Sequence, residues 1–181
     1  VVGASSLIQT SHGFYYAFGD LDWRAAGLDG LTIGIRWGIG VVAEIILFAL
    51  SPRLPSWVGP TMLLLIGAAG ATLRWVVMAT DPPALLLPLL QCLHGLSFGA
   101  TYLGAVLFVS RAAPEGLAAT AQGYLSTAGG IAHAGTIGLS GLLYGASGDL
   151  GYGVMAVVAA VGGICAFVAH QIEAGKRPSP P

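Results

Sequence analysis

Long apolar segments, separated by short turn sequences, run along almost the whole chain and leave few folds open to it. The clearest is the segment 85–109, which has roughly the length needed to cross the hydrocarbon core of a bilayer. Of the 181 residues, 55% are hydrophobic and 8% are charged, whereas a soluble domain carries about 25% charged residues. So little charge leaves too little polar surface for a water-soluble globule. We therefore expect an all-α membrane protein in contact with the lipid bilayer.

Six such segments are predicted to be transmembrane helices, because each is near the roughly 20 residues that a spanning helix needs. They cover about residues 1–18, 28–50, 59–79, 84–109, 117–144 and 150–171, within one domain over 1–175. Residues 176–181 are polar and proline-rich, which predicts a disordered tail. The first segment begins with no preceding loop, so we expect the chain to be a fragment whose first helix is cut at its start.

The charges between the segments predict how the helices are oriented. If six spans alternate, one side receives four cations: Arg53, Arg111, Lys176 and Arg177. The opposite side receives one cation and five aspartates: Arg24, Asp20, Asp22, Asp29, Asp81 and Asp149. Excess Lys and Arg marks the cytoplasmic side, which predicts a cytoplasmic C-terminus in the plasma (inner) membrane. The net charge of -1 argues against a nucleic-acid partner, which would need a basic patch.

The chain also contains a weak internal repeat. His12-Gly13 in the first span parallels His94-Gly95 in the fourth, and the segment 34–44 in the second parallels 123–133 in the fifth. Three helices that repeat as three helices must have opposite membrane topologies. The sequence therefore predicts a 3+3 inverted repeat, a design found in many transporters.

Ionisable and amide side chains inside the predicted spans are the main candidates for function. Glu44, Arg74 and His94 lie on successive spans, and charges inside a membrane are costly enough to suggest one shared polar site. Gln91 lies three residues before His94 and so shares its helix face. We predict a Glu44–Arg74 pair that takes part in solute binding, with His94 sensing or carrying a proton. A purely structural salt bridge is the alternative.

A second set of polar residues could line the same cavity or only join helices by hydrogen bonds. His12 and Tyr16 are four residues apart on the first span, while Gln122 and His133 are eleven apart on the fifth and share a face. Arg36 precedes Glu44 by eight residues, so it could face the same cavity or extend to the outer headgroups.

Five short motifs, in order along the predicted helices, resemble the C-terminal six-helix half of major facilitator superfamily transporters. They are His-Gly-Phe-Tyr-Tyr at 12–16, Ala43-Glu44-Ile45, Leu73-Arg74-Trp75, Gln91-x-Leu-His94-Gly-x-x-Phe98-Gly and Ala121-Gln122-Gly123. The sequence is similar to the phenylpropionate-permease-like branch, which is related to the lactose permease and nucleoside symporters.

This resemblance implies half of a twelve-helix secondary transporter, with the N-terminal six-helix half missing from this chain. It implies alternating-access transport of a small organic solute such as a sugar, nucleoside or aromatic acid, with no cofactor and a proton as possible coupling ion. Glu44, Arg74 and His94 match positions of a sugar and proton coupling network. Ser97 stands where the lactose permease has a proton-carrying glutamate, and Gln91 replaces a lysine. Proton coupling would therefore fall to His94 or Glu44, or be absent.

Two other classes of protein are alternatives to a transporter. The run 95–99 matches the G-x-S-x-G nucleophile pattern, and Ala132-His133 with Trp23-Arg24 faintly resembles rhomboid intramembrane proteases. That pattern needs a strand–turn–helix context, which a serine in mid-span lacks. A non-transporting structural membrane subunit would explain the many glycines but would give Glu44, Arg74 and His94 no role. With no metal-ligand spacing either, we expect neither an enzyme nor a metal site.

Overall fold

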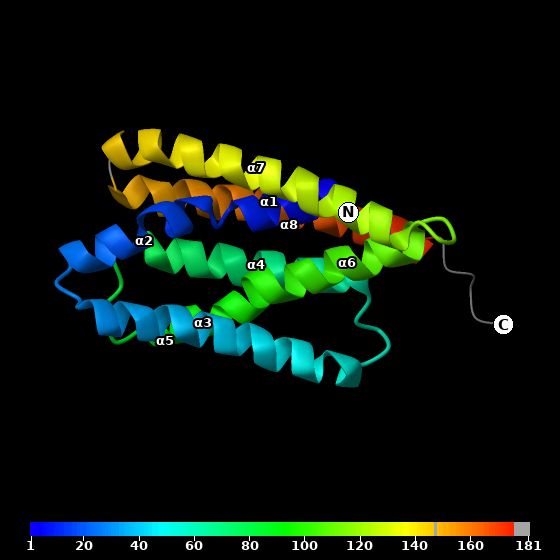
Figure 1. Cartoon of the computed structure of the whole chain (residues 1–181), viewed down its shortest axis with the longest axis horizontal. Coiled ribbons are helices and arrows are strands. Elements are labelled where there is room, and N and C mark those ends of the chain that lie inside the picture. The colour runs from blue at the N-terminus through cyan, green and yellow to red at the C-terminus, as the bar shows by residue number, and fades with distance from the viewer. Residues whose placement is uncertain (147, 176–181) are drawn as a thin grey trace.

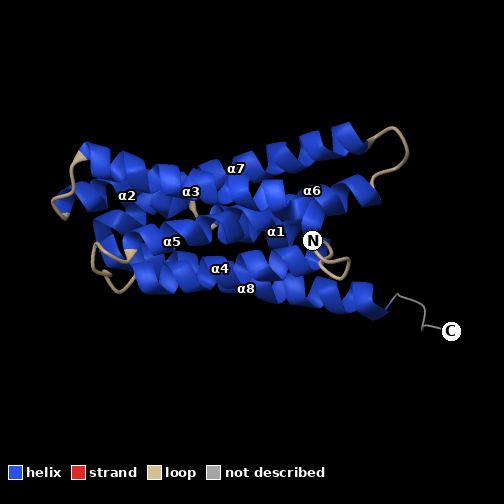
Figure 2. Cartoon of the chain, turned by 90° about the horizontal axis from the view of Figure 1, so that it is seen from below, coloured by secondary structure: helices blue, strands red, loops and turns tan. Residues whose placement is uncertain are grey.

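A computed structural model describes residues 1–146 and 148–175, and these form a bundle of helices without strands (Figure 1, Figure 2). In chain order the elements are α1 (Val2–Thr10), α2 (Gly13–Ala25), α3 (Gly30–Leu50), η1 (Ser51–Arg53), α4 (Pro60–Met78), α5 (Leu87–His94), η2 (Gly95–Ala100), α6 (Thr101–Ala112), α7 (Ala118–Ala146) and α8 (Gly148–Gly175). Residue 147 and the predicted tail at 176–181 lie outside the described residues.

The helices lie side by side along the length of the bundle (Figure 1), and α4 runs beside α8 along one face of it (Figure 2). Helix α4 packs against α8, against α1, and against the α5–η2–α6 segment. Helix α3 packs on α5 and η2 at one edge of the bundle, and α7 packs on α1 and α2 at the opposite edge. The interior is therefore built mainly from α1, α2, α4, the α5–η2–α6 segment and the inner face of α8.

Four helical stretches among the described residues are long and apolar enough to cross a membrane. They are Gly30–Arg53, Pro60–Met78, Leu87–Ala112 and Leu150–Gly175. They correspond to the predicted second, third, fourth and sixth spans. The glycine-rich α7 covers the predicted fifth span but is not in this set, and the first span is divided. The six-span count and the 3+3 repeat therefore stay predictions.

The first predicted span consists of two helices because side chains compete with the backbone at their junction. Ser11 Oγ donates to the carbonyl of Ile8 at 2.6 Å, and Nδ1 of His12 lies 3.2 Å from the carbonyls of both Ile8 and Gln9. The backbone amide of His12 bonds to Gln9, three residues back. Side-chain bonds to helix carbonyls bend helices, so the helix expected over 1–18 is divided at this point.

The fourth span is also interrupted, by the π-helical stretch η2, which the apolar pattern did not predict. At its first residue, Gly95, an added Cβ would lie only 2.8 Å from the backbone oxygen of Ala43 on α3. Glycine therefore lets the two backbones touch. Both His-Gly steps of the predicted repeat, at 12–13 and 94–95, lie at a helix interruption. Interruptions of the π type are frequent at functional sites.

Charged residues are separated between the two ends of the bundle. The α2–α3 and α4–α5 connections, near Asp29 and Asp81, lie at one end, and the α3–α4 and α6–α7 connections, near Arg53 and Arg111, lie at the other (Figure 1). Asp29 caps α3 by accepting hydrogen bonds from the amide and hydroxyl of Thr32 at 3.0 and 2.8 Å. These bonds hold the pKa of Asp29 below its ordinary value. These aspartates and arginines thus lie at opposite ends, which is the charge distribution from which the orientation of the helices in the membrane was predicted.

The contact between Gly95 and α3 can be tested by adding one methyl group. We expect Gly95→Ala to lower the free energy of unfolding by about 1–3 kcal/mol, the usual cost of overpacking against atoms that cannot move. The matched control is Gly153→Ala on α8, where an added Cβ meets nothing within 4 Å. Alanine favours a helix over glycine by about 1 kcal/mol, so the control should be neutral or slightly stabilising. Unfolding in detergent, followed by circular dichroism, measures both, and equal stability would contradict the contact.

Candidate functional site

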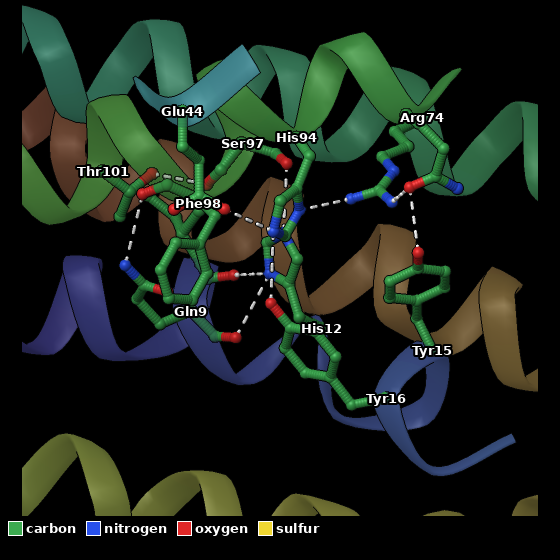
Figure 3. A network of polar contacts seen from close by, with 12 residues as sticks. Gln9, His12, Tyr15, Tyr16, Glu44, Arg74, His94, Ser97, Phe98 and Thr101 are labelled. Carbon is green, nitrogen blue, oxygen red and sulfur yellow. Dashed lines mark hydrogen bonds and ion pairs between the residues drawn. The ribbon is translucent and has the colours of Figure 1, made fainter. Parts of the chain in front are cut away.

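His94, at the end of α5, joins two charged residues from neighbouring helices. Its Nδ1 lies 2.8 Å from Nη1 of Arg74 on α4, and its Nε2 lies 2.9 Å from Oε1 of Glu44 on α3. Figure 3 shows the His94 ring between the two side chains. Within the described residues Glu44 and Arg74 form no direct ion pair. The predicted Glu44–Arg74 pair is thus replaced by a bridge through His94.

The partners of His94 determine where its proton lies. A guanidinium can only donate, so Nδ1 of His94 accepts from Arg74 and carries no proton. The remaining proton is on Nε2, which donates it to the Glu44 carboxylate. The neutral imidazole therefore satisfies both charges, whereas a second proton on Nδ1 would point at the guanidinium. The Tyr16 hydroxyl lies 3.3 Å from the same Nε2.

Arg74 is fully buried and held on several sides. Its Nη2 donates to Oε1 of Gln91 at 2.8 Å, and the same oxygen accepts from the Tyr15 hydroxyl at 2.9 Å. The centre of the guanidinium lies 4.6 Å from the ring centroids of both Tyr15 and Trp75, within the range of cation–π attraction. Arg74 Nε and Gln91 Nε2 are buried without a partner among the described residues. Arg74 is therefore enclosed by protein.

His12 lies inside the bundle beside His94, at a ring-centroid distance of 5.4 Å. Its Nδ1 faces backbone carbonyls and so carries the proton, and its Nε2 accepts from the Ser97 hydroxyl at 3.0 Å. Ser97 is fully buried on the π-helical stretch, and no carboxylate in the described residues contacts His12. The geometry of a serine protease is thus missing from this Ser–His pair.

A cavity of about 460 Å³ lies beside this network, between α1, α2, η2, α6 and α7. Tyr16 and His133, both predicted as cavity-lining, are in its wall, with their rings 5.4 Å apart. The sequence did not single out Gln9, Phe98 or Tyr102, which line it as well. For Gln9 a signal was present, because it precedes His12 by three residues and Tyr16 by seven, as residues on one helix face do.

Two predicted residues lie elsewhere. Arg36 donates from Nη2 to the carbonyl of Ala84 at 3.2 Å, and its guanidinium lies 5.8 Å from the Trp23 ring, so it is directed away from Glu44. Gln122 donates from Nε2 to Ser110 Oγ at 2.7 Å and is outside the cavity wall. The described residues contain no group of three or more His, Cys, Asp or Glu that could hold a metal ion.

Comparison with known proteins connects this arrangement to a family. The family model described as "MFS_1 like family" matches residues 2–152, a range that includes Glu44, Arg74 and His94. A protein of Escherichia coli (strain K12) named "Probable 3-phenylpropionic acid transporter" is 33% identical over 153 residues, which are 84% of this chain. The match covers 40% of that relative's length, so the chain spans less than half of it. No solved structure matches the chain significantly.

The amide of Gln91 can be tested as the partner of the buried guanidinium. We expect Gln91→Leu to lower the free energy of unfolding by about 1–3 kcal/mol, because Arg74 Nη2 would lose its acceptor in a buried place. The control is Gln171→Leu, an exposed glutamine on α8, with an expected change within about 0.5 kcal/mol. Chemical unfolding in detergent measures both, and a Gln91 variant as stable as the control would mean that Arg74 does not need this partner.

Proposed function

The chain belongs to the MFS_1 like family of the major facilitator superfamily, and from this premise we propose that it is the six-helix half of a secondary transporter. The transporter moves a small organic solute across the membrane by alternating access. The bridge from Glu44 through His94 to Arg74, buried beside a cavity, is the observation that carries this proposal. A structural subunit would need neither the buried charges nor the cavity.

The cavity between α1, α2, η2, α6 and α7 is the proposed solute site. Its wall includes the rings of Tyr16, Phe98 and Tyr102 and the hydrogen-bonding groups of Gln9 and His133. Largely apolar cavities with a few polar groups are typical of small-molecule sites. Because the relative from Escherichia coli is named for 3-phenylpropionic acid, we propose an aromatic acid as solute, ahead of a sugar or nucleoside.

Proton coupling is proposed to act through His94. When this imidazole is neutral, it accepts from Arg74 and donates to Glu44. A second proton would occupy Nδ1, the atom that accepts from Arg74, and would therefore break that bond. Two protonation states would thus favour two arrangements of α3, α4 and α5, which is the difference in contacts that a conformational switch requires. This role falls to His94 because Ser97 has no acidic proton to exchange near neutral pH.

The partner of this half is proposed to be an N-terminal six-helix half that packs on α3 and α7. Both helices expose small residues with open space around them, such as Gly34 and Gly38 on α3 and Gly130 and Gly138 on α7. Small residues on an exposed helix face allow close helix packing in a membrane. In this proposal the C-terminus is cytoplasmic, the protein lies in the plasma (inner) membrane, and the two halves rock about the solute site.

The transport proposal is tested by uptake into vesicles that hold the full-length protein. We expect uptake of aromatic acids in preference to sugars and nucleosides, and faster uptake with an inward pH gradient than without one. The gradient should act on the transporter itself, so protein-free vesicles with the same gradient are the control. Uptake of sugars alone would contradict the substrate class, and equal uptake with and without the gradient would contradict proton coupling.

Glu44 is tested by removing its charge while keeping its shape. We expect Glu44→Gln to abolish uptake without reducing membrane insertion, since a neutral amide no longer holds the negative end of the bridge through His94. The matched control is Glu115→Gln, an exposed glutamate in the connection between α6 and α7, which should retain uptake. Uptake is measured at equal amounts of inserted protein. Unchanged uptake in the Glu44 variant would remove this residue from the mechanism.

A further inference from the structure

In the part of the chain that the structure describes, the cavity wall contains no formally charged side chain. The polar groups in it come from Gln9, His133, the serines Ser5, Ser6 and Ser126, and the tyrosine hydroxyls. None of these described wall residues is a Lys or Arg, so a carboxylate that entered would lose its water without gaining a cation from the wall as partner. An unpaired buried charge is far more costly than a buried neutral group with one hydrogen bond.

The nearby charges are already occupied. Arg74 is fully buried behind the rings of Tyr15 and Trp75 and donates to His94 and Gln91. Glu44 accepts from His94, so the bridge of the two charged residues has no net charge when His94 is neutral. An anion in the cavity would therefore find no free positive partner among the wall residues that the structure describes.

Gln9, a residue of the cavity wall, instead has a side-chain hydrogen-bond acceptor without a partner among the described residues. Its Nε2 donates to the carbonyl of Phe98 at 3.4 Å, and since a carbonyl can only accept, the amide nitrogen must face Phe98. Its Oε1 then lies on the other side of the amide, where it has almost no accessible surface and no donor among the described residues. A buried acceptor without a partner is destabilising, so a rotation of this side chain that lets Oε1 accept a hydrogen bond from a ligand in the cavity is favoured.

We propose that the cavity receives its aromatic acid in the neutral, protonated form, with the acid O–H donating to Oε1 of Gln9. This inference rests on the proposed function and names the chemical form of its solute. The aromatic ring of the solute packs among Tyr16, Phe98 and Tyr102, and its acid group lies at Gln9. The proton bound to the solute then enters the cavity with it. The bridge through His94 governs the side of the membrane to which the solute site is open.

Other groups near the cavity can also titrate, and their effect on the pH dependence of binding must be distinguished from that of the solute. Tyr16 of α2, Tyr102 of α6 and His133 of α7 are in the wall itself. The rings of His12 and His94 pack against the Phe98 ring, at centroid distances of 5.7 and 5.3 Å, and Glu44 lies beyond His94. A pH dependence that belongs to these groups is the same for every solute, whereas one that belongs to the solute follows the solute's own pKa.

The test is equilibrium binding to the full-length protein in detergent at a series of pH values, with three probes of similar shape. They are 3-phenylpropionic acid, its analogue fluorinated beside the carboxyl group, which has a lower pKa, and the corresponding sulfonate, which stays anionic. We expect affinity for the first to fall about tenfold for each pH unit above its pKa. At a given pH the fluorinated acid should bind more weakly by the ratio of the two neutral fractions, and the sulfonate should not bind.

Two variants locate the interaction. Gln9→Met keeps the length of the side chain but removes the acceptor, and should weaken binding of 3-phenylpropionic acid about tenfold, as loss of one hydrogen bond does. The exposed Gln171→Met on α8 should bind as the unchanged protein does. His133→Gln should keep the pH dependence of binding, since the proton belongs to the solute.

Three results would overturn the inference. The first is sulfonate binding as tight as that of the acid, which would mean that a cation such as Arg74 turns to meet the anion. The second is equal affinity for the two acids at one pH, and the third is loss of the pH dependence in His133→Gln. None of these three results would contradict the proposed transport of aromatic acids. Absence of binding by all three probes at every pH would instead refute both the proposed substrate class and this inference.

Discussion

The whole site depends on one imidazole that accepts from a guanidinium and donates to a carboxylate. Arg74 and Glu44 come from different helices, and each would be costly inside the bundle without a partner. His94 satisfies both, at 2.8 and 2.9 Å, only while it is neutral and has its proton on Nε2. The bridge therefore links the positions of α3, α4 and α5 to a single protonation state.

The surrounding packing serves to hold this bridge in place. The rings of Tyr15 and Trp75 flank the guanidinium at 4.6 Å each, and Gln91 accepts from its second nitrogen. The close backbone contact at Gly95 brings α3 near enough for Glu44 to reach His94. With its charges satisfied internally, the network leaves the neighbouring cavity electrically neutral. In the proposed function, the same pairing that stabilises Arg74 thus limits which solutes the cavity binds.

Much of this could be predicted from the sequence, and the rest depends on contacts that a pattern does not contain. Apolar length located four helices that are long and apolar enough to span a membrane. Glu44, Arg74 and His94, grouped in the sequence by the cost of intramembrane charge, lie in contact through His94. The sequence did not predict which of the three residues lies between the other two, because that depends on the register of α3 against α5. The break at Ser11 and the π-helical stretch after His94 were also not predicted, since they arise from side-chain bonds to carbonyls and from a backbone contact. Gln122 shares a helix face with His133 but lies beyond the cavity, bonded to α6.

The contacts of His94 make it a neutral bridge between Glu44 and Arg74. Nitrogen-15 NMR of the His94 ring, in full-length protein reconstituted in lipid near neutral pH, measures this directly. A neutral bridge requires one protonated nitrogen, Nε2, and one unprotonated nitrogen, Nδ1, that accepts a hydrogen bond. Two protonated nitrogens, or a proton on Nδ1 alone, would contradict it, because Arg74 could then not donate to this ring.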